Sequence, residues 1–528
     1  MKMATAGVKA ISRQSFFSER YSDYHYSLLD FAEYLKKGKI DLLLTCLFGL
    51  MGYGLKMFSN SFSIDTEAMI AVPDSLYQSW VVLERSGLMG IKEILGLYDY
   101  NNALASFLTG VFLITAAVLW SYLFAGVNKV KGRLFRISWF SVPFVASPFL
   151  AEMLGFTLMG PEVAIAIGLV AIALMATHNG MCNQRIYLLI AIVAAIVSFS
   201  IYLAMVTLYI TGTAMMFVVL FYARDYKRKL SPIVMLLGHV VIFFVSYAGY
   251  RLINQIVLMI NHASVDPYIS EQSRWSKDPF ITVLFSIAKH AIEVYSGTGI
   301  FYSILGTISF AIYFLFIITS VIRKKTWWMI TLVSFMICCA PMLMSVILGS
   351  DPSERTEMTY PLVFSFVISF LCMNLAKINA LKAVTWILIV VIGWNQSLIV
   401  NRIFYTEAVN HSQDIALAQN IESRINLLDY PRTETPTLVF LGFHKSNCVK
   451  GCFPSERLGL VGRSIFETTV SPEQGTFVKT NFMATQGFIY QQASNKQLEE
   501  AQLLSADMPH WPESGSIKYV NKMIIVNF

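Results

Sequence analysis

Ser63-Ile64-Asp65-Thr66-Glu67 lies inside a polar interruption at residues 58–103, with strongly apolar runs before and after it. Two carboxylates therefore stand a few residues beyond a first run that is long enough to be a transmembrane helix. Charge close to hydrocarbon is costly, so acids in such a place need a structural or chemical reason. We interpret the interruption as the loop around which the chain is organised, and as a candidate enzyme site.

Composition places the chain among membrane proteins. Its 528 residues are 55% hydrophobic and 14% charged, with a mean hydropathy of +0.57. These values predict a polytopic α-helical membrane protein. The net charge of +7 does not indicate nucleic-acid binding, because the basic residues form short clusters at the ends of apolar runs. Residues 1–34 lack the pattern of a removable signal peptide, so we expect the first span to direct the chain to the membrane.

Eleven apolar runs are long enough, or nearly so, to cross about 30 Å of hydrocarbon. The sequence therefore predicts about eleven transmembrane helices in a domain at 41–402, preceded by a cytoplasmic amphipathic segment at 1–40 with a surface helix at 24–37. The runs are 41–57, 104–125, 138–158, 162–177, 186–201, 204–222, 233–257, 300–322, 327–348, 359–376 and 383–400.

The basic clusters predict the topology. With a cytoplasmic N-terminus and eleven spans, all of them fall on the cytoplasmic side. The outer side then receives the loop at 58–103, a second loop at 258–298, the short loop at 349–355 and the tail from 403. This assignment requires two helices within 186–222, separated near Tyr202. The clusters are Lys129, Lys131, Arg133 and Arg136, then Arg224, Lys227, Arg228 and Lys229, then Arg323, Lys324 and Lys325, and then Lys377 and Lys382.

Residues 403–528 are polar and turn-rich, which predicts a small extracytoplasmic α/β domain. We expect a helix at 406–428 and strands at 437–441 and 522–526. Cys448 and Cys452 lie four residues apart outside the membrane, which favours a disulfide over free thiols or a zinc pair that includes His444.

Asp65 and Glu67 would share one face of an extended segment but not of a helix. We expect an extended entry after Asn60 and Ser61. A carboxylate at a membrane boundary can have its pKa raised by low dielectric or lowered by a nearby cation, as a general base requires. The alternative, equally weighted on pattern alone, is that both acids only begin a loop helix.

Farther along the first loop, apolar residues recur at helical spacing and predict one interfacial helix. They are Trp80, Leu83, Leu88, Ile91 and Leu95. Arg85 in this stretch could bind a phosphate through paired hydrogen bonds, or could reach lipid headgroups.

Other outer residues could contact a phosphorylated, sugar-bearing lipid. Arg274 stands beside Trp275, and His290 and Glu293 share a helical face. Arg355 lies in a short and therefore tightly positioned loop. Interfacial anchoring and a local ion pair are the plainer interpretations of these groups. Glu152 and Glu162 flank the third and fourth spans at their outer ends, where acids usually face a cavity or a partner.

Several short motifs resemble the type II family of serotype-converting O-antigen glucosyltransferases. The resemblance covers most of the chain. The sequence departs from the family pattern at Thr66, which separates two acids that are adjacent in many relatives, and at Glu162, where aspartate is common. The motifs are Ile64-Asp65-Thr66-Glu67, Trp80 with Glu84-Arg85-Ser86-Gly87-Leu88, Ser147-Pro148-Phe149-Leu150-Ala151-Glu152, Met508-Pro509-His510-Trp511-Pro512 and Gly515-Ser516-Ile517-Lys518.

The resemblance implies a fold similar to the GT-C glycosyltransferases and transfer of glucose, or another hexose, from undecaprenyl phosphate to lipid-linked O-antigen. The reaction would occur on the periplasmic side of a bacterial inner membrane. The family's acidic site falls on Asp65 and possibly Glu67, and its loop arginine falls on Arg355. We predict that Asp65 is the base with Glu67 as a possible helper, and that Arg355 binds the phosphate, assisted by Arg85 or Arg274. We also predict Trp80 and the other outer residues named above as substrate contacts.

The implied partners are the lipid-linked donor, the acceptor and membrane lipids, with a donor synthase and a donor-sugar flippase upstream. We expect no cofactor besides the donor and no required metal, because one or two acids outside a dense carboxylate cluster bind Mg²⁺ poorly. The competing hypothesis is a transporter or flippase of a lipid-linked saccharide, which would also need charges around a cavity. The outer position of the acids favours the enzyme.

Overall fold

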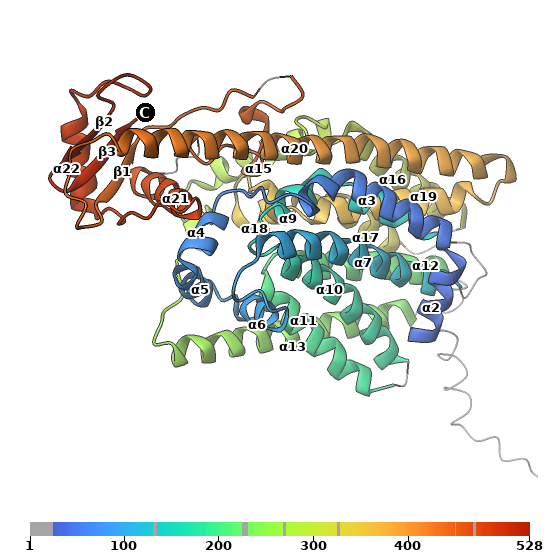
Figure 1. The fold of residues 1–528 in the computed structure, drawn as a ribbon. Coiled ribbons are helices and arrows are strands. Elements are labelled where there is room, and N and C mark those ends of the chain that lie inside the picture. Colours follow the sequence, from blue (N-terminus) through green and yellow to red (C-terminus); the bar gives the residue numbers. More distant parts are fainter. Residues whose placement is uncertain are drawn as a thin grey trace, which may run out of the picture.

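The computed structural model describes residues 25–129, 135–182, 184–223, 231–267, 271–324, 328–448, 450–467 and 471–528. Helices make up most of it, and a small sheet lies near the C-terminus (Figure 1). The helices are α2 (Leu28–Lys37), α3 (Lys39–Met57), α4 (Thr66–Ala71), α5 (Pro73–Val82), α6 (Ser86–Ile94), α7 (Asn102–Lys129), α8 (Ile137–Val145), α9 (Pro148–Leu154), α10 (Gly160–Met181), α11 (Ile186–Ile201), α12 (Met205–Ala223), α13 (Ser231–Ile260), α15 (Phe280–Ser296), α16 (Ile304–Lys324), α17 (Trp328–Cys339), α18 (Leu343–Leu348), α19 (Thr359–Leu375), α20 (Lys382–Ile425), α21 (Pro472–Thr485) and α22 (Asn495–Ser505).

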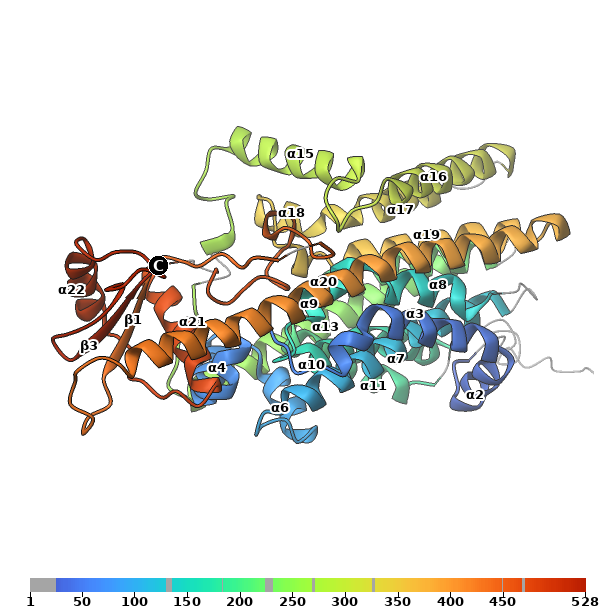
Figure 2. The ribbon, with the colours of Figure 1, turned by 45° about the horizontal axis from the view of Figure 1, so that its top comes forward.

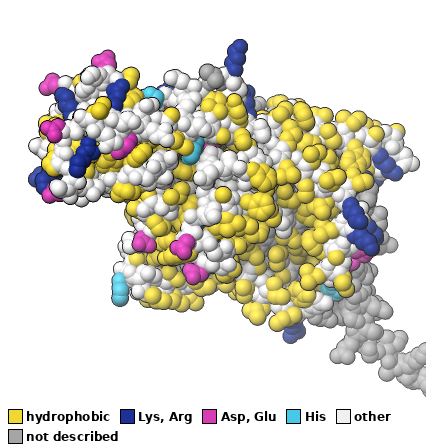
Figure 3. All heavy atoms as spheres, viewed as in Figure 1, with side chains coloured by type: hydrophobic (Ala, Val, Ile, Leu, Met, Phe, Trp, Pro, Cys, Tyr) yellow, Lys and Arg dark blue, Asp and Glu magenta, His cyan; other side chains and the backbone are white. Residues whose placement is uncertain are grey.

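The structure supports a membrane-spanning bundle. Eight helical segments among the described residues are long and apolar enough to cross a membrane, or nine if the bent pair α8 and α9 is one span. Helices α11 and α19 are apolar but shorter. Each of the eleven predicted runs therefore overlaps a helix, while the count of eleven spans stays a prediction. Figure 3 shows an apolar surface over the middle of the bundle, with charged side chains mainly toward the two ends.

The two ends of the bundle differ. Helix α2 packs at one end, where the Tyr26 N–H donates to Asn179 near the end of α10. The C-terminal domain lies at the other end (Figures 1 and 2). Helices α11 and α12 are separate and meet at Tyr202, as the predicted topology requires. Since α11 runs back along α10, with Ser198 donating to the Ala166 carbonyl, the break at Tyr202 lies toward the domain end.

The described members of the four predicted basic clusters lie at the α2 end. Arg136 pairs with Asp41 at 3.1 Å and stacks on Trp386. Lys377 and Lys382 lie at the junction of α19 and α20. For the remaining residues of these clusters, either the whole residue or its side chain lies outside the described part of the chain. They are Lys129, Lys131, Arg133, Arg224, Lys227, Arg228, Lys229, Arg323, Lys324 and Lys325.

The C-terminal domain contains a three-stranded sheet in the order β1-β3-β2. Strand β1 (Thr437–Leu441) pairs in parallel with β3 (Met523–Asn527), and β2 (Ile517–Val520) pairs antiparallel with β3. Both predicted strands are confirmed, and β2 is additional. The predicted helix at 406–428 is the continuation of α20, which runs without a break from the last apolar run into the domain. The predicted boundary at 403 therefore falls inside a helix.

Candidate active site

The acids of the first loop lie on either side of a helix start. Asp65 has a left-handed backbone, with φ 72°, and α4 begins at Thr66. Aspartate tolerates this conformation better than most residues do. The expected extended arrangement is wrong, because the turn at Asp65 begins a helix that places Glu67 in its first turn. Glu67 is fully buried, whereas Asp65 is partly exposed.

The surroundings of Asp65 and Glu67 favour different protonation states. Burial raises the pKa of Asp65, and the charges of Arg355 and Arg85 oppose this rise. Burial also raises the pKa of Glu67 well above its ordinary value, and the neighbouring Asp65 charge adds to the rise. Backbone groups of Glu67 and Asp65 oppose this rise only in part, and no side chain among the described residues hydrogen-bonds to the Glu67 carboxyl group. Glu67 is therefore suited to remain protonated, and Asp65 is the acid that two cations help to ionise.

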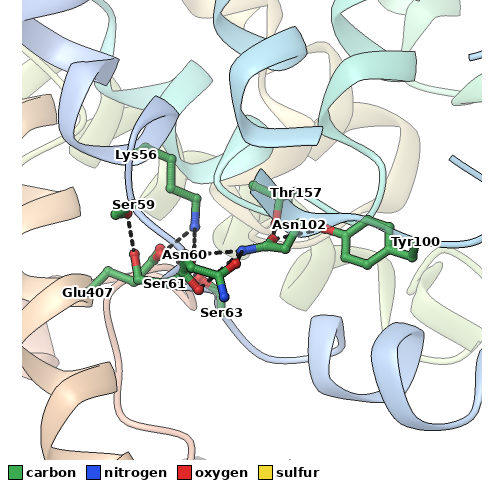
Figure 4. Close-up of polar contacts among 9 residues, drawn as sticks. All are labelled: Lys56, Ser59, Asn60, Ser61, Ser63, Tyr100, Asn102, Thr157 and Glu407. Atoms are coloured by element: carbon green, nitrogen blue, oxygen red, sulfur yellow. Dashed lines mark hydrogen bonds and ion pairs between the residues drawn. The ribbon is translucent and has the colours of Figure 1, made fainter. Parts of the chain in front are cut away.

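The chain that leads to Asp65 is held by a buried network (Figure 4). At the end of α3, Lys56 pairs with Glu407 of α20 and donates to the Ser61 carbonyl at 2.9 Å. The Ser63 hydroxyl donates to the same Glu407 carboxylate at 3.0 Å. Both charged side chains are almost completely buried. The network thus attaches the segment before Asp65 to the long helix α20.

A second set of hydrogen bonds extends this network toward α9 and α10. Asn102, at the start of α7, donates to the Asn60 carbonyl at 3.2 Å. The Thr157 hydroxyl donates to the Asn102 side-chain oxygen at 2.6 Å, and Tyr100 donates to Thr157 at 3.0 Å. Figure 4 shows these side chains in one continuous group. Both ends of the first loop are therefore fixed beside the turn that follows α9.

Glu407→Gln should destabilise the protein by about 3–5 kcal/mol, because it leaves the buried Lys56 without a carboxylate. Unfolding titrations in mixed detergent micelles would measure the change. Adding Lys56→Met should recover part of the loss, since the unpaired charge is then gone. Glu456→Gln, which breaks the exposed pair with Lys445, is the matched control and should change little. Equal stability of Glu407→Gln and wild type would contradict this role.

Arg85 lies at a turn between two helices. The single interfacial helix predicted over 80–95 is wrong, because the chain turns at Glu84, which has a φ of 58°. Glu84 is buried and pairs with Arg251 of α13. The Ser86 N–H approaches Asn254 of the same helix at 3.4 Å. These contacts hold the turn against α13 and place the Arg85 guanidinium over the Tyr202 ring, 5.4 Å from its centre.

Arg355 belongs to a short 3-10 helix, η2 (Glu354–Thr356), in the loop before α19. Its guanidinium lies 5.3 Å from the centre of the Phe156 ring. Its charge also acts on both Asp65 and Glu152. The structure therefore brings Asp65, Arg85 and Arg355 together from three separate segments.

Glu152 and Glu162 are buried beside this group and have protein partners. Glu152 accepts the Leu460 N–H at 2.6 Å, which attaches α9 to the C-terminal domain. Glu162 pairs with Lys92 at 2.8 Å, and both side chains are fully buried. Trp80 is buried next to this pair, with the Lys92 ammonium 5.6 Å from the centre of its ring. All three contribute to the packing around the first loop.

The second outer loop lies beside the loop that carries Arg355. The Arg274 N–H donates to the Leu348 carbonyl at 2.8 Å, and the Trp275 indole donates to the Val346 carbonyl. The Arg274 side chain is half-exposed and lies 4.0 Å from Asp278. His290 contacts Glu357 and Asp351 rather than Glu293, the partner expected from helical spacing.

Cys448 and Cys452 form a disulfide with Cα atoms 6.0 Å apart. Arg402 of α20 donates to the Gly451 and Cys452 carbonyls at 2.7 Å each. The disulfide loop is therefore attached to α20 at the level of the site.

Sequence reasoning assigned no role to several residues of this region, among them Lys56, Lys92, Glu84, Glu357 and Glu407. A signal for Lys56 was present, since a lysine near the end of an apolar run needs a partner. The partner could not be found by spacing, because Glu407 is 351 residues away.

The bundle and these charges define a class: a polytopic membrane protein with an acid and two arginines at one end of its spans. The chain belongs to the GtrII glucosyl transferase family, since the model described as "Glucosyl transferase GtrII" matches residues 54–373, more than half of the chain. This match confirms the family resemblance. It includes Asp65, Arg85 and Arg355 and ends before residues 508–518. No match was found among curated proteins or among solved structures.

Proposed function

We propose that the protein transfers glucose, or another hexose, from an undecaprenyl-phosphate donor to lipid-linked O-antigen on the periplasmic side of a bacterial inner membrane. The family implies glucosyl transfer in O-antigen modification. The observation that carries the proposal is the grouping of Asp65 with Arg355 and Arg85. One carboxylate can accept the proton of a hydroxyl nucleophile, and two guanidinium groups can neutralise the charge of a departing phosphate.

The proposed step is a single displacement at the anomeric carbon. Asp65 removes the proton from an acceptor hydroxyl, and the hydroxyl oxygen forms a bond to that carbon. The bond between the carbon and the phosphate oxygen breaks, and its electron pair leaves with the lipid phosphate. Arg355 and Arg85 stabilise the charge of this leaving group, which needs no added proton at neutral pH. A β-linked donor would give an α-glycoside.

The charge pattern supports the proposed side of the membrane. Arg136, Lys377 and Lys382, the described members of the predicted basic clusters, lie at the α2 end, and the candidate site lies at the domain end. The positive-inside rule assigns the α2 end to the cytoplasm and the domain end to the periplasm. No nucleotide sugar is available there, so a lipid-linked donor is the consistent choice. The architecture is proposed to be GT-C-like, with a donor synthase and a donor flippase acting upstream.

Trp80, Glu152 and Glu162 are proposed to support the substrate cavity, while Arg274, His290 and Glu293 are proposed to lie along its rim. These assignments rest on their positions around the loops that carry Asp65 and Arg355. The proposed reaction uses no cofactor besides the lipid-linked donor.

Purified protein given undecaprenyl phosphate glucose and lipid-linked O-antigen should release undecaprenyl phosphate and place labelled glucose in the glycan. A flippase of lipid-linked saccharides would move the donor across vesicles without breaking its phosphate bond. Donor translocation without release of undecaprenyl phosphate would therefore overturn the proposal. Omission of the acceptor is the control, because it should suppress release.

A further inference from the structure

A buried histidine joins α15 to the loop that carries Arg355. His290 is 2% exposed and lies between two carboxylates. Its Nε2 is 2.5 Å from Glu357, which also accepts a hydrogen bond from Tyr302. Its Nδ1 is 2.8 Å from an oxygen of Asp351. Figure 2 shows α15 beside α16 and α18, on the side of the bundle where this loop begins.

The two ring nitrogens are in different situations. Nε2 donates to Glu357, which leaves Nδ1 of the neutral ring with a lone pair. An oxygen of Asp351 lies 2.8 Å from Nδ1, which has no other partner among the described residues. Two lone-pair atoms this close require a positive charge between them. A proton on Nδ1 would supply this charge, and so would a metal ion bound to both atoms.

The 2.8 Å spacing of Nδ1 and the Asp351 oxygen is also what two ligands of one metal ion show. Nitrogen and oxygen ligands lie about 2.0–2.2 Å from Zn²⁺, so neighbouring ligands of one ion are roughly 3 Å apart. Glu293, on the next turn of α15, supplies a third group, and ligand atoms of His290, Glu293 and Asp351 all lie within 4.8 Å of one another. Lys289 approaches Glu293 only at 4.0 Å, in an exposed pair that an ion could displace.

We propose that His290 Nδ1, Asp351 and Glu293 bind a divalent transition-metal ion, with Zn²⁺ or Mn²⁺ as the fitting class. One imidazole with two carboxylates suits these ions better than Ca²⁺ or Mg²⁺, which prefer oxygen ligands alone. Glu357 and Tyr302 orient the histidine from behind, as carboxylates commonly do for metal-binding imidazoles. Water would complete the coordination.

The ion would connect two outer loops that the sequence leaves far apart. Asp351 precedes Arg355 by four residues in the same short loop, and His290 and Glu293 lie on α15. Binding would therefore hold the Arg355 loop against the second outer loop. The ion takes no part in the proposed displacement, and the site does not depend on the proposed function.

The test uses untagged full-length protein in detergent, stripped with a chelator and then titrated with Zn²⁺ or Mn²⁺ without any substrate. Metal content after desalting should reach one ion per chain. His290→Ala and Asp351→Asn should remove this ion, and Glu357→Gln should weaken binding by roughly 10–100-fold. Glu293→Gln is the variant least able to disturb folding, because Glu293 is partly exposed, and it too should weaken binding.

His262→Asn and Glu271→Gln are matched controls from the same outer loop, and both should keep the ion. Asparagine tolerates the positive φ of 50° at His262. Wild-type protein that retains no ion, or a Glu293→Gln variant that binds as tightly as wild type, would overturn the proposal. Since no donor or acceptor is present, failure of metal binding is distinguishable from failure of glucosyl transfer.

Discussion

Asp65→Asn is expected to lower glucosyl transfer by roughly 10²–10⁴-fold while the protein stays folded. Asparagine has nearly the same shape as aspartate and tolerates the left-handed backbone at this position, whereas alanine would be strained there. The amide cannot accept the hydroxyl proton. Initial rates of undecaprenyl phosphate release by purified variants, compared at equal amounts of folded protein, would measure the effect.

Two companion variants test whether the loss of activity is specific to Asp65. Asp74→Asn removes an exposed acid of the same loop and should retain wild-type activity. Glu67→Gln should keep most of the activity, because burial already favours the protonated form of Glu67 and glutamine resembles that form. Full turnover by Asp65→Asn would refute the central assignment, and a collapse confined to Glu67→Gln would transfer the role of base to Glu67.

The same assignment predicts the pH dependence of the rate. A general base acts only when it is deprotonated, so kcat/KM should fall as the pH drops through the pKa of Asp65. Burial raises this pKa, so the fall should begin at a higher pH than an ordinary aspartate would give.

Arg355→Gln is expected to lower kcat by roughly 10²–10³-fold, because the departing phosphate loses a fixed cation. The variant should also move the acid limb of the pH profile upward, since the Arg355 charge now opposes the rise in the pKa of Asp65. Both readouts come from one set of initial-rate measurements across pH.

Arg355→Lys distinguishes the effect of the positive charge from the effect of the planar guanidinium group. It keeps the cation, so the acid limb should stay close to its wild-type position, but it loses the planar fork that binds phosphate through two hydrogen bonds. Arg457→Gln, an exposed arginine of the C-terminal domain, is the control and should match wild type. An unchanged kcat with Arg355→Gln would exclude Arg355 from the site.

Local sequence determined much of this protein. Hydropathy placed a helix at every predicted span, including the break near Tyr202, because the lengths of apolar runs are local properties. The short, continuous apolar runs at 437–441 and 522–526 likewise identified two strands. Asp65 was singled out because charge close to hydrocarbon is costly, and Arg355 because its loop is short and therefore tightly positioned.

Tertiary structure decided what those residues can do. The left-handed backbone at Asp65 starts a helix that buries Glu67 and leaves Asp65 within reach of two arginines from distant segments. The partner of Lys56 is 351 residues away, and that of His290 is 67 residues away. Periodicity and charge at short range cannot encode such pairings, because they depend on which helix ends meet when the bundle packs.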